Sequence, residues 1–188
     1  AVTAGLIAIT QVTTKDRITR NQQEAEAAAL YEIIPQSRVD QSLLDHKIAL
    51  ASPELLGLKA EAQAYQAIKS GEVVAVILPS IAPDGYSGDI SLIVGINLDG
   101  TVAGVRVLTH RETPGLGDKV ETKKSDWIYS LTGWTFKDGG WNVKKEGGRF
   151  DAFTGATITP RAVIKATERA LVYFNLNKMA LTQVGGKS

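Results

Sequence analysis

The seven residues D-A-F-T-G-A-T, which end at Thr157, stand directly ahead of an expected closing helix. Gly155 and Ala156 are small, so a separate enzyme that modifies this chain could reach the Thr157 hydroxyl. A phosphate esterified there would lie near the first turn of the helix, whose free N–H groups and dipole favour negative charge. The spacing alone favours a simpler interpretation, in which Thr154, Thr157 and Thr159 are turn and capping hydroxyls.

A second stretch, E-T-P-G-L-G, begins at Glu112 and follows an expected strand. Its glycines would let the backbone approach a flat ligand, and Leu116 could pack against the face of that ligand. The alternative is a glycine-rich loop with Leu116 in the hydrophobic core. The stretch lacks the G-x-G-x-x-G spacing of a dinucleotide-binding fold and opens no long apolar helix.

The amino-acid composition argues against several classes of function. The chain has no cysteine, which excludes thiolate zinc sites, cysteine-ligated iron–sulfur clusters and dithiol redox chemistry. Its two histidines, His46 and His110, show no metal-binding pattern, so no metal site is predicted. The net charge is +1 and the basic residues are spread along the chain, which argues against nucleic acid as a partner. Any redox role must therefore use another cofactor.

The elements that would position these stretches are predicted from periodicity and turn residues. Helix-forming residues run from Thr14 to Ile34, and Pro35 ends them. Asp99-Gly100 is a turn dipeptide typical of a β-hairpin. Short apolar runs predict strands at 73–78, 90–98 and 102–110, and residues 46–50 could form another.

Two further helices are expected after these strands. A short one should hold Trp127, and a closing one should begin with Thr159 as N-cap and Pro160 in its first position. Strands and helices without regular alternation predict an α+β fold, with a mixed or antiparallel sheet packed against helices.

The first ten residues, A-V-T-A-G-L-I-A-I-T, are mostly apolar. They are too few to cross a bilayer, which takes roughly 20. We interpret them as the second half of a spanning helix, with a signal-peptide remnant as the alternative. Lys15, Arg17 and Arg20 would by themselves place the domain in the cytoplasm, but that rule compares two flanks and only one is present.

Taken with their order, the motifs resemble a known family. D-A-F-T-G-A-T resembles the D-x-x-[ST]-G-A-[ST] signature of FMN-binding domains, on which a flavin transferase moves FMN from FAD to the last hydroxyl residue, here Thr157. E-T-P-G-L-G resembles the loop that lies along the flavin in those domains. G-Y-S-G at residues 85–88, with the following I-S-L-I-V-G-I-N-L-D-G-T-V-A-G-V, is similar to their strand pair.

Nearly the whole chain resembles the G subunits of the Rnf (Rsx) ion-translocating electron-transport complexes. The resemblance implies a covalent FMN that relays electrons, other membrane subunits as partners, and a flavin transferase during maturation. It also implies a bacterial inner-membrane protein with one N-terminal anchor and a periplasmic domain. The implied parts are an anchor remnant (1–12), a stalk-like helix (13–36) and an FMN-binding domain (37–188).

Two alternatives stay open at this point. One is a component similar to the C subunits of sodium-pumping NADH:quinone reductases, which share the flavin motifs. The other is a non-redox extracytoplasmic assembly or sensor module that kept the domain.

By the resemblance, Thr157 is an attachment site rather than a catalytic residue, and no catalytic residue or metal ligand is expected. Asp151 would belong to the signature that the transferase recognises. Glu112 could instead hold the backbone of its own loop, and Trp127 could be a core residue. The residues expected to contact FMN are Thr157, Thr154, Gly155, Ala156, Glu112, Thr113, Pro114, Gly115, Leu116, Gly117 and Trp127.

Overall fold

Five antiparallel strands form one sheet in the order in which they follow along the chain. Antiparallel neighbours need only short connections, which is why no crossover interrupts this order. In this computed structural model, which describes residues 24–184, the strands are β1 (Lys47–Ala49), β2 (Gln63–Lys69), β3 (Glu72–Gly85), β4 (Gly88–Asn97) and β5 (Val102–Thr109).

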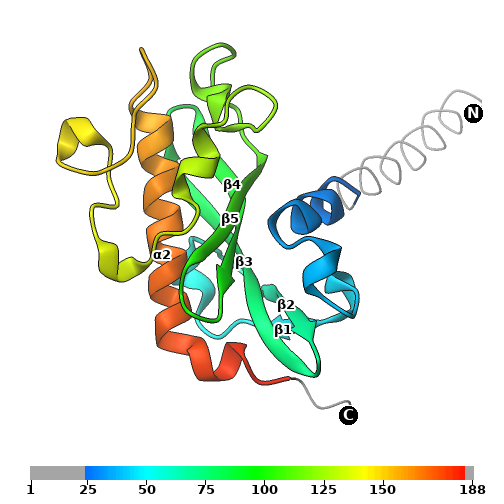
Figure 1. Cartoon of the computed structure of the whole chain (residues 1–188). Coiled ribbons are helices and arrows are strands. Elements are labelled where there is room, and N and C mark those ends of the chain that lie inside the picture. The colour runs from blue at the N-terminus through cyan, green and yellow to red at the C-terminus, as the bar shows by residue number, and fades with distance from the viewer. Residues whose placement is uncertain (1–23, 185–188) are drawn as a thin grey trace, which may run out of the picture.

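Residues 24–33 are helical, and the closing helix α2 spans Ile158–Leu181. Short 3-10 helices make up much of the connecting chain, at Gln36–Arg38, Leu43–Asp45, Pro53–Leu56, Gly117–Val120, Trp127–Leu131, Phe136–Asp138 and Lys144–Glu146. In Figure 1, α2 lies along one face of the sheet and the blue helical residues 24–33 lie on the other. The expected α+β class and the antiparallel sheet are confirmed.

Both faces of the sheet are buried, because successive side chains of a strand point to opposite faces. On β4, Leu92 and Val94 belong to the cluster under α2, whereas Ile93 belongs to the cluster under residues 24–33. A strand covered on both sides reads as a continuous apolar run rather than an alternating one. This explains the I-S-L-I-V-G-I sequence of β4.

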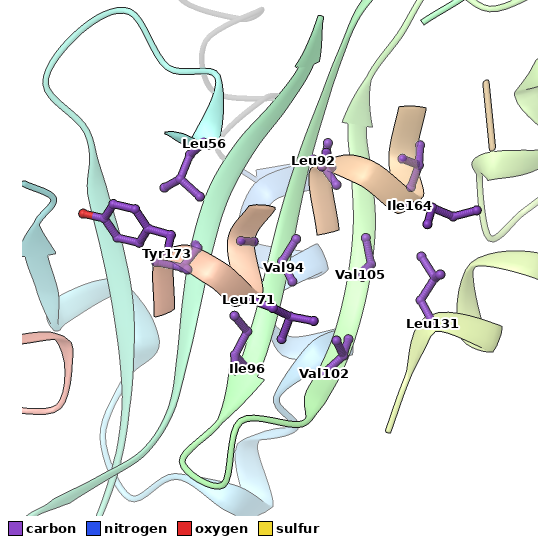
Figure 2. Close-up of a cluster of buried hydrophobic side chains, with 14 of the residues drawn as sticks. Leu56, Leu92, Val94, Ile96, Val102, Val105, Leu131, Ile164, Leu171 and Tyr173 are labelled. Atoms are coloured by element: carbon purple, nitrogen blue, oxygen red, sulfur yellow. The ribbon is translucent and has the colours of Figure 1, made fainter. Parts of the chain in front are cut away.

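The larger cluster fills the space between α2 and the sheet. Figure 2 shows Leu171 from α2 beside Val94 and Ile96 of β4, and Ile164 from the same helix on the side of Val105 of β5 and Leu131. Most of these side chains are inaccessible to solvent. Removing that much apolar surface from water holds α2 on the sheet.

The opposite face has a depression into which a helix side chain fits. Gly95 of β4 and Gly104 of β5 are paired across the two strands. A Cβ atom at Gly95 would lie 2.2 Å from Cγ2 of Ile33, closer than real Cβ atoms approach. The two glycines therefore allow Ile33 to reach the sheet surface.

Several predicted elements are confirmed. The strand expected at 46–50 is β1, and the expected strands at 90–98 and 102–110 are β4 and β5. Gly100 has φ +88° in the turn between them, a conformation that favours glycine. The short helix expected around Trp127 is the 3-10 helix Trp127–Leu131.

Other predictions were incomplete or wrong. β2 was not predicted, and β3 continues through Pro79 to Gly85 instead of ending at Leu78. Pro79 is paired with Ile93 of β4 but lies beyond Tyr65–Ile77, the outermost pair of β2 with β3 at this end, so only one strand flanks it.

The expected membrane anchor at 1–12 and the first part of the expected stalk helix lie outside the described residues. From residue 24 the stalk segment packs on the domain, since Leu30, Ile33 and Ile34 are buried against the sheet. Within residues 24–184, no helix is both long enough and apolar enough to span a membrane.

Candidate functional site

Three segments that are far apart in the sequence meet around one cavity at an end of the sheet. They are the β3–β4 turn, the E-T-P-G-L-G loop after β5, and the start of α2. The cavity measures 310 Å³, at the lower end of the range for ligand sites. It is lined by Tyr86, Glu112, Thr113, Leu116, Gly117, Gly155, Ala156, Thr157, Ile158 and Thr159.

The Glu112 carboxylate joins the three segments. It is 4 % exposed and accepts hydrogen bonds from the backbone N–H groups of Tyr86 at 3.1 Å and Ser87 at 2.8 Å. The hydroxyl of Thr159, in the first turn of α2, donates to the same carboxylate. Glu112 was expected to contact the flavin or to hold its own loop. The carboxylate lines the cavity and holds the turn and the helix on either side of that loop, and its contact with the flavin stays a prediction.

Gly117 allows this close approach, and Gly155 lies beside Leu116 of the loop. A Cβ atom at Gly117 would lie 2.8 Å from both Cβ of Glu112 and Oγ1 of Thr159, so no side chain fits there. Gly155 has φ +79°, and a Cβ atom there would lie 3.5 Å from Cδ2 of Leu116. The loop and the D-A-F-T-G-A-T segment are therefore in contact at the cavity.

Leu116 is 41 % exposed and lines the cavity. The alternative that placed it in the hydrophobic core is wrong. Tyr86, at 67 % exposed, and Ile158, at 38 % exposed, also line the cavity. Together these three side chains give the cavity an apolar rim that is open to solvent.

Thr157 is the residue that precedes α2, and it lines the cavity. Its carbonyl accepts the first helical hydrogen bond, from the N–H of Arg161 at 3.2 Å, but its side chain does not cap the helix. The expected N-cap at Thr159 is wrong, because the helix begins at Ile158 and Thr159 is turned inward to Glu112. Pro160 consequently occupies the third helical position rather than the first.

Some of the predicted site residues lie outside the cavity lining. Thr154, Pro114 and Gly115 are exposed beside it. Asp151 is exposed as well and forms a surface ion pair with Lys144 at 2.8 Å. The ring of Trp127 donates from Nε1 to the carbonyl of Asp151 at 2.7 Å and packs edge-on against Phe153 at 5.0 Å between ring centroids. In this arrangement Trp127 supports the D-A-F segment.

His110 is held on both ring nitrogens. Its Nδ1 accepts from the N–H of Glu112 at 3.0 Å, so the ring proton is on Nε2, which lies 2.8 Å from Oε1 of Glu121. These contacts orient the start of the E-T-P-G-L-G loop. They give this histidine a structural role.

Comparisons with known proteins show the family of this chain. Residues 85–172 match the FMN-binding domain family, and residues 1–33 match the RnfG N-terminal region. The chain is 48% identical over 183 residues to the G subunit of the ion-translocating oxidoreductase complex of Pseudomonas aeruginosa (strain UCBPP-PA14), an alignment that covers 96% of this chain and 86% of that protein. The chain belongs to the family of G subunits of ion-translocating oxidoreductase complexes.

Other G subunits have similar identities. Those of Vibrio vulnificus (strain YJ016) and Shewanella piezotolerans (strain WP3 / JCM 13877) are 47% and 45% identical to this chain. Each alignment covers 94% of this chain, and 84% and 85% of the respective relative. Membership of the G-subunit family confirms the resemblance inferred from the motifs, and it decides against the alternative based on the sodium-pumping reductase.

Sequence reasoning missed three lining residues, namely Tyr86, Ile158 and Thr159. Tyr86 was in a quoted motif but was assigned only to the strand pair. The missed signal was its place in a short turn between two long strands, which brings it to the same end of the sheet as the loop after β5. Thr159 gave no local signal, because its partner is 47 residues away.

Proposed function

We propose that this member of the G-subunit family carries FMN as a phosphoester on Thr157 and relays electrons through it within the complex. The observation that supports this proposal is the shared cavity. Thr157, which ends the signature, and Leu116, in the loop expected along the flavin, line the same space although they are far apart in sequence. Hydroxyls that served only turns and helix capping would not need such a space.

The residues present fit the group. Among the described residues that line the cavity, Glu112 is the only charged one, and its carboxylate is hydrogen-bonded to the turn and to Thr159. A phosphate on Thr157 would instead meet the first turn of α2, whose N–H groups favour an anion. The apolar rim of Leu116, Tyr86 and Ile158 offers surface for a flat ring.

Attachment through the phosphate serves a relay in two ways. It keeps the cofactor from being lost, and it leaves the ring chemically unmodified and free to face a partner. When bound, FMN supplies the electron-accepting chemistry, and the protein supplies position and electrostatics. We expect no substrate of the protein's own, in keeping with an electron carrier.

We further propose the setting that membership of the G-subunit family implies. Residues 1–12 would be the end of a single inner-membrane anchor, and the domain would lie on the periplasmic side. The match of residues 1–33 to the RnfG N-terminal region supports this organisation. The partners would be other membrane subunits, with a flavin transferase acting during maturation and Asp151 in its recognition signature.

The attachment is tested on full-length chain produced together with a flavin transferase. The wild type should keep flavin absorbance after denaturation and gain the mass of one FMN-phosphoester. Thr157→Ser keeps a hydroxyl and should keep the covalent flavin, whereas Thr157→Ala should lose all of it. Thr154→Ala is the control in the same segment, and its flavin should map to the peptide that contains Thr157.

Covalent flavin on the Thr157→Ala protein would disprove the attachment site. The relay is tested separately, by redox titration of the loaded protein. A flavin that is attached but cannot be cycled between oxidised and reduced forms would instead support the non-redox module.

A further inference from the structure

The E-T-P-G-L-G loop begins with Glu112, whose buried carboxylate is not explained by ligand contact alone. Glu112 is 4 % exposed, and its hydrogen-bond partners among residues 24–184 are two backbone N–H groups and one hydroxyl. All three are donors, the set that an ionised carboxylate accepts. Burying a charge is costly unless such bonds compensate it, so an apolar residue would be the cheaper filler of this position.

The three donors come from the other two walls of the cavity. Tyr86 and Ser87 form the β3–β4 turn, and Thr159 lies two residues after Thr157 on α2. Gly117 leaves space for the Glu112–Thr159 contact, since a Cβ atom there would lie 2.8 Å from both. The carboxylate thus sets the separation between the rim residue Tyr86 and the attachment residue Thr157.

We propose that Glu112 is the positioning residue of the FMN site. Its hydrogen bonds hold the walls of the cavity together before FMN binds, and its negative charge lowers the midpoint potential of the FMN. The second part follows from electrostatics, because each electron that FMN accepts adds negative charge unless a proton follows. A fixed carboxylate in the same cavity lining disfavours that added charge. This inference rests on the proposed function.

The geometric part predicts a defect in the flavin-free chain. Glu112→Gln keeps the size of the side chain but turns an amide NH₂ toward donors. At least one of the three hydrogen bonds to Tyr86, Ser87 and Thr159 is therefore lost. The amide hydrogens of Tyr86 and Ser87 should then exchange faster with solvent, as measured by NMR or mass spectrometry. Asp118→Asn is the matched control. It neutralises another buried carboxylate nearby, one that pairs with Lys124 at 3.5 Å and does not line the cavity.

Transfer of FMN should also slow in Glu112→Gln, by about tenfold or more, because small displacements of a reacting group have large effects on rate. The midpoint potential of the flavin that is attached should be more positive than in wild type. Thr159→Val separates the two effects. It removes one link and keeps the charge, so transfer should slow with little change in potential, and Thr159→Ser should restore the rate.

The outcomes distinguish this inference from the proposed function. The inference would be overturned if the Glu112→Gln protein had the same amide exchange, FMN-transfer rate and midpoint potential as the wild type. That result would leave the attachment at Thr157 intact. A wild-type chain that accepts no FMN would overturn the proposed function, and amide exchange in that flavin-free chain would still decide whether Glu112 holds the turn. If Glu112→Gln does not fold, the rate and the potential of the Thr159→Val and Thr159→Ser pair decide the geometric part.

Discussion

The two faces of the sheet are covered by helices with different roles. On one face, α2 packs over most of its length on β3 and β4, and its first turn forms a wall of the cavity. On the other face, residues 24–33 cover a smaller cluster, and the cavity lining includes none of them. The first face therefore combines stability with the site, whereas the second holds the N-terminal segment in place.

The polar contacts follow the same division. The α2 face is joined to the rest of the fold by buried bonds such as Gln66 Nε2 to the carbonyl of Leu181 at 2.8 Å. The contacts of residues 24–33 lie nearer the surface, as in the ion pair of Glu32 with Arg106 at 2.7 Å. Partly exposed pairs contribute little to stability. We expect the helical residues 24–33 to detach from the sheet before the sheet itself unfolds.

The largest effect on stability is expected on the α2 face. Leu171→Ala removes a fully buried side chain and should lower the free energy of unfolding by about 2–5 kcal/mol. Leu176 lies on the same helix but is 74 % exposed, so Leu176→Ala should change stability by no more than about 0.5 kcal/mol. Urea unfolding of both variants measures the difference. Equal losses would show that α2 is not held by its buried side.

A smaller loss is expected from filling the depression on the other face. Gly95→Ala places a methyl group against Ile33 and should cost about 1–3 kcal/mol. Gly104→Ala should cost less, because its Cβ would lie 3.4 Å from Ile33.

An Ile33→Ala background tests the cause, since Gly95→Ala should cost less there. Both glycine variants should accept FMN at the wild-type rate, measured by flavin absorbance after denaturation. Slowed transfer would contradict the separation of the two faces.

The smallest effect is expected at alkaline pH. Burial, together with the hydrogen bond to Glu26 and its negative charge, raises the pKa of Tyr65 from 10.0 to about 12. The neutral phenol is therefore favoured in the folded state. Its contribution is complete below pH 10 and is lost as the pH rises to about 12.

Tyr65→Phe should remove this part of the alkaline loss of stability. Unfolding free energies of wild type and variant, compared between pH 9 and pH 12, measure it. Parallel pH curves would show that the link between β2 and residues 24–33 contributes nothing.

Local signals predicted much of the fold. Asp99-Gly100 specifies a hairpin by its own conformational preferences, and the apolar run of β4 identifies a strand buried on both faces. β2 was missed because Gln66 looks like a surface residue. It is buried, and it is satisfied by the carbonyls of Leu181 and Gln183 at the far end of the chain. Such a partner cannot be found by inspecting neighbouring residues.

The candidate site divides in the same way. The sequence by itself determined the family, Thr157 as the expected acceptor among the hydroxyls, and the loop that belongs beside it, because short motifs carry their meaning in adjacent residues. Only the tertiary structure decided that Glu112 turns away from its own loop to hold Tyr86, Ser87 and Thr159. The physical reason is that a buried carboxylate must find its donors wherever the folded chain brings them, and here they come from segments 25 to 47 residues away.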